Sequence, residues 1–170
     1  EPILSTSIHS GYFLGAMPEN YPAKNLPVPS SVATDCTSLI QMCQQEAGIK
    51  FPEGFKLLSN RVVSLMTEPG AELTYPEIAD YKTLYDVEPL ECEAQLRPGD
   101  AVVFRGHAFI FGGYRKDGAK GLRMITYEAI GGEYRSVGQF YREIYRGDSC
   151  QGPIWTASGD SQAFILRPKK

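Results

Sequence analysis

The chain has 170 residues, a formal net charge of -3 and the composition of a globular protein. A chain of this length fits one domain of ordinary size, which buries roughly 70% of its unfolded surface. The charge gives no basic footprint for a nucleic acid, and no apolar run approaches the ~20 residues of a membrane-spanning helix. The four cysteines and two histidines show no zinc-site spacing, so we expect no metal and no other cofactor.

The first residue is Glu1, so the chain is either a processed product or a shortened one. We prefer removal of a secretory signal, which predicts a secreted or periplasmic protein. Cys92 and Cys150 are then the expected disulfide pair, because both lie in loop-like sequence and neither has a catalytic rationale. Cys36 and Cys43 are two turns apart on one predicted helix, about 10 Å along its axis, and are too far apart to bridge each other.

The N-terminal part of the chain predicts a loop-rich segment followed by a helix. Residues 1–34 are rich in Pro, Ser, Asn and Gly, and we expect them to pack as loops on the rest of the domain. A helix is expected over 36–47, because Asp35 is a good N-cap and Gly48 supplies a stop. Cys36 then occupies the first helical position, on the same face as the apolar side chains of that helix.

The middle of the chain predicts further helix. A second helix is expected over 54–66, and residues 67–95 predict a long connection with a short helix near 75–81. The apolar residues at helical spacing in the second helix are Phe55, Leu58, Val62 and Leu65.

From residue 96 the apolar pattern has the period of strands. The break at Arg105-Gly106 predicts an antiparallel hairpin, whereas 134–145 is ambiguous between strand and helix. The expected strands are 101–104, 107–111 (closed by Gly112-Gly113), 122–130 and 164–166. Helices first and a meandering antiparallel sheet second predict an α+β fold in a single domain over 1–170.

Cys36 is the candidate nucleophile. A thiol at a helix start meets unpaired N–H groups and the positive end of the helix dipole, which favour the thiolate. An ordinary thiol, with a pKa near ~8.5, is only a few per cent ionised at neutral pH. The alternative is a buried core thiol, and the helix alone leaves both interpretations open.

A cysteine nucleophile needs a base, and His107 is the candidate. It begins a predicted strand directly after a tight break, on the same face as Phe109 and Phe111, which we expect to pack under the cysteine helix. The alternative is a histidine satisfied at a sheet edge. His9 lies in a predicted loop and is interpreted as a surface residue.

Glu128 is the candidate for the group that orients the base. It is the only charged side chain on its face of the predicted strand 122–130, and a charge there is costly unless it is paired. An imidazolium would pair with it. A structural salt bridge to Arg97 or Arg105 is the competing explanation.

Four blocks of this sequence together resemble the NlpC/P60 cysteine peptidases. Asp35-Cys36-Thr37-Ser38-Leu39-Ile40, followed by Ala47-Gly48-Ile49, resembles the family's "DCSGLV…AGI" block. Leu96–Phe104 resembles its "L-x-PGD-L-V-F-F" strand, and His107–Gly113 resembles "HVGIYLG". Ile125–Ala129 resembles the later strand that carries the family's third polar residue. The blocks occur in family order. The resemblance implies a papain-like fold with N-terminal helices packed on a central antiparallel sheet. It also implies Cys36 as nucleophile, His107 as base and Glu128 as the third member.

The resemblance further implies a tyrosine that positions the thiol, for which Tyr12 is the candidate and Tyr21 the fallback. Asp35, Thr37 and Ser38 are expected beside it as thiol-positioning or substrate-binding residues. Three features depart from the family. Ser38 replaces a glycine, Glu128 replaces the usual histidine, and the connection from the Phe104 strand to His107 is short.

The activity implied is hydrolysis of amide bonds in peptidoglycan stem peptides, of the D-glutamate–diamino acid type. We expect a monomer whose partner is the peptide substrate, with an inhibitory or immunity protein as a further candidate partner. Two alternatives stay open. One is a hydrolase, acyltransferase or deamidase of the same fold acting on a host protein or lipid, and the other is a non-catalytic binding domain.

Overall fold

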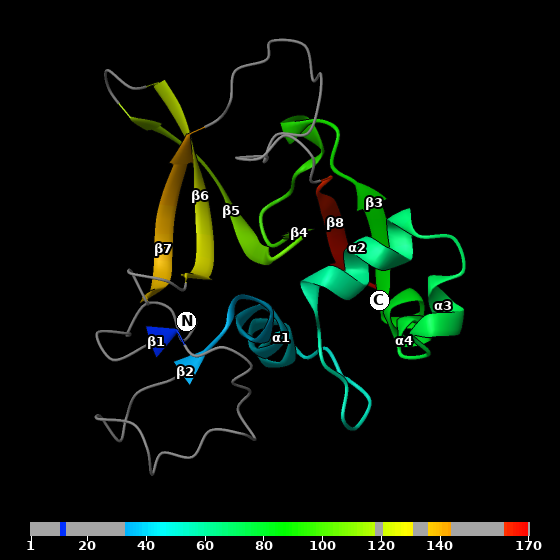
Figure 1. The fold of residues 1–170 in the computed structure, drawn as a ribbon. Helices are drawn as coiled ribbons and strands as arrows, with labels where there is room; N and C mark the ends of the chain where they lie inside the picture. The colour runs from blue at the N-terminus through cyan, green and yellow to red at the C-terminus, as the bar shows by residue number, and fades with distance from the viewer. Residues whose placement is uncertain (1–10, 13–32, 118–120, 131–135, 144–161, 170) are drawn as a thin grey trace.

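The computed structural model describes residues 11–12, 33–117, 121–130, 136–143 and 162–169. These residues form an α+β fold of short helices and one sheet (Figure 1). The helices are α1 (Cys36–Glu46), α2 (Ser59–Thr67), α3 (Ala71–Thr74), α4 (Ile78–Leu84) and the 3-10 turn η4 (Glu93–Gln95). The strands are β1 (Gly11–Tyr12), β2 (Ala33–Thr34), β3 (Tyr85–Pro89), β4 (Ala101–Phe104), β5 (His107–Asp117), β6 (Gly121–Ile130), β7 (Ser136–Glu143) and β8 (Phe164–Pro168).

The strands form one sheet in the order β2-β1-β7-β6-β5-β4-β8-β3. All neighbouring strands are antiparallel except β1 and β2, which are parallel. The predicted α+β class with an antiparallel sheet is therefore confirmed. Within the described ranges no helix is both long and apolar enough to cross a membrane.

The core lies in two main clusters on opposite faces of the central strands. Neighbouring residues of β5 alternate between the clusters, with Ala108 in one and Phe109 in the other. The helices α1, α2 and α4 contribute to the cluster around Ala108, and Figure 1 shows α1 beside the ends of β5 and β6. The cluster around Phe109 contains Phe111 and Met124 but no residue of α1. The expectation that Phe109 and Phe111 pack under the cysteine helix is therefore wrong.

Helix α1 begins and ends close to the predicted limits. The Asp35 side chain caps it by accepting a 2.7 Å hydrogen bond from the Ser38 N–H, and Gly48 follows with φ 92°. Helix α2 starts five residues later than expected, at Ser59. The backbone before it bonds to tertiary partners instead, since Leu57 N–H donates to the Gln41 side chain and Leu58 N–H to the Tyr81 hydroxyl. These bonds replace the first helical turn, and Leu58 is 42% exposed and not in the core.

The glycine pair Gly112-Gly113 was predicted to end strand β5, but it lies inside the strand. The register with β6 shifts between Phe111 and Gly113, which marks a β-bulge. Gly113 has φ 118°, and a Cβ on Gly112 would come within 2.7 Å of the Tyr127 ring. The two glycines therefore bend a strand that continues to Asp117.

The stretch predicted as a long connection contains strand β3 as well as helices, and 136–143 is resolved as strand β7. Short strands β1 and β2 also lie in the segment predicted as loop, most of which is outside the described residues. Cys92 is disulfide-bonded, as expected, whereas Cys36 and Cys43 are free. Cys150, its expected partner, lies outside the described residues.

Candidate active site

Cys36 stands at the first position of α1, where the helix meets the start of β5. The sulfur lies against the backbone N–H of Ala108, the residue after His107, and against the N–H groups of Thr37 and of Cys36 itself. Among the described residues, the pairing of β5 with β6 begins at Ile110 and Tyr127, although β6 runs on to Ile130. The thiol therefore lies where these two strands are no longer paired.

Burial governs the protonation of the Cys36 thiol. Only 8% of the residue is exposed, and this desolvation raises the pKa of the thiol to about 11, with the negative charge of Asp35 as the next cause. The three backbone N–H groups lower the pKa but do not outweigh burial. The N–H groups at the helix start therefore favour the thiolate, as expected, but burial outweighs them and the pKa of the Cys36 thiol is raised overall.

His107 and Glu128 are paired. His107 Nε2 lies 2.8 Å from Glu128 Oε2 across the gap between β5 and β6. When Glu128 is ionised its oxygens only accept hydrogen bonds, and the proton of this bond is then on Nε2. Nδ1 is then the ring nitrogen that can accept a proton.

The surroundings fix the imidazole at the end of its strand. The ring packs edge-on against Phe104, with centroids 5.6 Å apart and planes at 72°. Phe104 is the register partner of His107 across the hairpin. The turn between them is held by Asn60 of α2, whose side chain accepts a 3.0 Å hydrogen bond from the Gly106 N–H.

Glu128 is fully buried, so its charge depends on its partners. It bonds to His107 through one oxygen and accepts a hydrogen bond from the Thr126 hydroxyl through the other. The competing salt bridges are not formed among the described contacts of the two arginines. Arg105 pairs instead with Glu68 at 3.7 Å, and Arg97 uses its backbone N–H to bind Asp100.

The residues predicted beside the thiol form its helix cap. Asp35 Oδ1 accepts hydrogen bonds from the Ser38 N–H at 2.7 Å and from the Thr37 hydroxyl at 3.2 Å, and all three residues are buried. Tyr12 lies in β1 with its backbone in register with Thr34, two residues before Cys36. This pairing brings the backbone of Tyr12 next to the segment that leads to Cys36. Tyr21 and His9 lie outside the described residues.

Two contributors to the site are not among the residues predicted from the sequence. The backbone N–H of Ala108 carries no sequence signal, because any residue at that position supplies it. Thr126 had a signal, since it shares the strand face of Glu128 two residues away. A hydroxyl at a buried strand position needs a hydrogen-bond partner, as a buried charge does.

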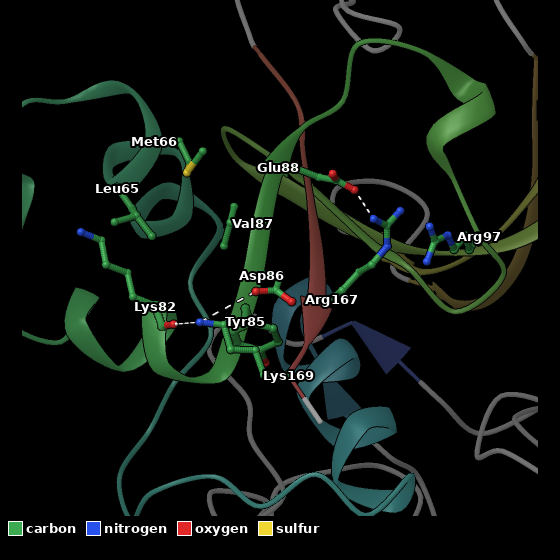
Figure 2. Close-up of a pocket in the computed structure, with 10 residues that line it drawn as sticks. All are labelled: Leu65, Met66, Lys82, Tyr85, Asp86, Val87, Glu88, Arg97, Arg167 and Lys169. Atoms are coloured by element: carbon green, nitrogen blue, oxygen red, sulfur yellow. Dashed lines mark hydrogen bonds and ion pairs between the residues drawn. The ribbon is translucent and has the colours of Figure 1, made fainter.

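The described ranges contain no group of three His, Cys, Asp or Glu side chains that could bind a metal. A cavity of about 760 Å³ lies elsewhere, beside β3 and β8 (Figure 2). Its charged side chains are largely paired with each other or with their neighbours, including Arg167 with Glu88 and Lys169 with Asp86. The residues lining it do not include Cys36, His107 or Glu128.

Comparison with protein-family models, with curated proteins and with solved structures finds no match to the chain. The resemblance to the NlpC/P60 peptidases therefore rests on the four sequence blocks alone.

Proposed function

We propose that this protein is a cysteine hydrolase with the papain-like fold of the NlpC/P60 family. The observation that carries the proposal is the 2.8 Å contact between His107 Nε2 and the buried Glu128 carboxylate. The residue after His107, Ala108, contacts the Cys36 sulfur through its backbone N–H. A nucleophile, a base and a group that orients the base form the arrangement that nucleophilic catalysis requires. The three side chains come from α1, β5 and β6, in the chain order of the family.

The proposed reaction is hydrolysis of an amide through an acyl-enzyme. As the Cys36 sulfur attacks the carbonyl carbon, its proton passes to His107 Nδ1, because burial raises the pKa of the resting thiol. The C–N bond then breaks as His107 returns this proton to the leaving amine. Water, deprotonated by His107, then attacks the thioester carbonyl; the C–S bond breaks, the acid is released and His107 returns the proton to the Cys36 sulfur. Backbone N–H groups at the start of α1 are the candidate donors to the oxyanion.

The proposed substrate is the stem peptide of peptidoglycan, cleaved at the bond between D-glutamate and a diamino acid. This assignment rests on the family resemblance, as does the proposed secreted or periplasmic location. Asp35, Thr37 and Ser38 would hold the helix start in place, and Tyr12 would lie next to the segment leading to Cys36. A host protein or a lipid is the alternative substrate on the same catalytic residues.

A second candidate function is a non-catalytic binding domain. The observation that favours it is the burial of Cys36 and the raised pKa of its thiol, which are typical of an inert core cysteine. In that case His107 and Glu128 form a structural pair.

Digestion of purified peptidoglycan tests the proposal. Mass spectrometry of the products should reveal new amine termini and fragments whose masses identify the bond. Cys36→Ala should abolish them, whereas Cys43→Ala, which removes the other free thiol of the same helix, should not. Turnover of another acyl substrate without cleavage of peptidoglycan would overturn the cell-wall assignment. Equal biological activity of wild type and Cys36→Ala would support the binding domain.

A further inference from the structure

Thr126 and Glu128 lie two residues apart on β6 and point to the same face of the strand. Both side chains are fully buried. The Thr126 hydroxyl donates a hydrogen bond to Glu128 Oε1, while Glu128 Oε2 is bound to His107 Nε2 at 2.8 Å. One oxygen of the carboxylate is thus anchored to its own strand and the other to the candidate base.

The strand face around Thr126 is apolar. Its register partner on β5 is Phe111, and Met124 precedes it on the same face in the same buried surroundings. Valine has nearly the shape of threonine and suits such a position. A buried hydroxyl is costly unless it forms a hydrogen bond, and the bond that this one donates is to Glu128. The hydroxyl is therefore the feature of Thr126 that packing does not explain.

Anchoring both oxygens restricts how the carboxylate can turn. The terminal torsion of a glutamate is broad, so a carboxylate fixed through one oxygen can rotate about it. A neutral imidazole has two tautomers, and the partner of one nitrogen decides which is populated. An ionised carboxylate held with Oε2 at Nε2 therefore favours the tautomer of His107 with its proton on Nε2.

We propose that Thr126 is a positioning residue of this site, whose hydroxyl orients Glu128 so that His107 keeps its proton on Nε2. Nδ1 is thereby left as the atom that accepts the Cys36 proton. The role of Nδ1 as the acceptor of the Cys36 proton rests on the proposed function. The tautomer itself does not, and it can be measured without any substrate.

Nitrogen NMR of histidine-labelled protein reads the tautomer directly. The chain has only two histidines, so a His9→Gln background leaves His107 as the single signal. At a pH where the ring is neutral, wild type should have Nε2 protonated and Nδ1 unprotonated. Thr126→Ser keeps the hydroxyl and should give the same spectrum. Thr126→Val removes it and should give a mixture of tautomers.

Kinetics provide the second measurement. Thr126→Val should lower kcat about tenfold with little change in KM, because one hydrogen bond to a charged group is lost while the substrate contacts remain. Thr126→Ser should recover most of the loss. Thermal unfolding of each variant checks that the comparison is made on folded protein.

Two results would overturn the proposal. One is a wild-type His107 protonated on Nδ1, a measurement that needs no variant to fold. The other is a Thr126→Val protein that retains both the wild-type tautomer and the wild-type kcat. If no form cleaves peptidoglycan, the proposed substrate fails, but the NMR spectra still decide whether Thr126 orients Glu128.

Discussion

The backbone N–H of Ala108 points at the sulfur of Cys36, so the first turn of α1 meets the first residues of β5 at the thiol. His107 directly precedes Ala108 and is paired with Glu128. The strand that carries the candidate base thus also contacts the candidate nucleophile through its backbone. This relationship ties the position of the sulfur to the position of the ring.

The rate at which Cys36 is alkylated should depend strongly on pH. Burial raises the pKa of its thiol to about 11, and the thiolate is the reactive form. The thiolate fraction, and with it the rate, should therefore rise about tenfold per pH unit from about pH 7 and level off only near the raised pKa. Iodoacetamide labelling followed by mass spectrometry of the modified peptide measures this in a Cys43→Ala background. A rate that is already constant below about pH 8 would instead indicate a thiolate–imidazolium pair.

Glu128→Gln should lower turnover while the protein stays folded. The amide keeps the size of the side chain but removes the charge that stabilises an imidazolium, and we expect kcat to fall by about 10²-fold. Glu53→Gln, at an exposed position, is the matched control and should change nothing. A large loss of thermal stability in Glu128→Gln, with little change in activity per folded molecule, would instead assign the pair a structural role.

Asn60→Ala should loosen the turn that precedes His107. The substitution removes the acceptor of the Gly106 N–H, and we expect kcat/KM to fall a few-fold, with about 1 kcal/mol lost in the free energy of unfolding. Arg105→Gln is the control in the same turn, because its 3.7 Å pair with Glu68 is exposed and contributes little. Equal effects of the two variants on kcat/KM would refute a specific role for Asn60.

Arg167→Met should destabilise the protein without affecting the chemistry. The guanidinium binds both oxygens of the buried Asp100 at 2.8 Å and also contacts Glu88 and the Gln95 carbonyl. Leaving that carboxylate unpaired should cost about 3 kcal/mol in the free energy of unfolding. Lys169→Met, which removes a 3.8 Å exposed pair with Asp86, should cost at most about 1 kcal/mol. Urea unfolding of both variants makes the comparison.

The elements defined by local signals could be predicted from the sequence. The cap at Asp35, the hairpin break at Arg105-Gly106 and the apolar strands around it all appear in the structure. Strand β3 could not be predicted, because Tyr85–Pro89 contains two acidic residues and a proline and becomes a strand only by pairing with β8. At Gly112-Gly113 the sequence does not distinguish a strand end from a bulge, because a turn and a bulge use the same residues, and the structure has a bulge.

Part of the candidate site could likewise be predicted from the sequence, and part could not. Glu128 was expected to need a partner because a charge on an apolar strand face is costly, and it is bound to His107. The protonation of Cys36 could not be inferred from its helix position, because the opposing effect is burial by residues distant in sequence. Sequence indicates which groups can meet, whereas tertiary packing determines their ionisation.

The proposed function requires that Cys36 form an acyl-enzyme with a peptidoglycan peptide. Its most direct test is the intact mass of the protein quenched in acid during turnover of a purified stem peptide, followed by mapping of the modified residue. We expect an adduct with the mass of the acyl fragment on Cys36, lost on further incubation and absent from Cys36→Ala. Cleavage of the peptide by Cys36→Ala at the wild-type rate, with no adduct on Cys36, would contradict it.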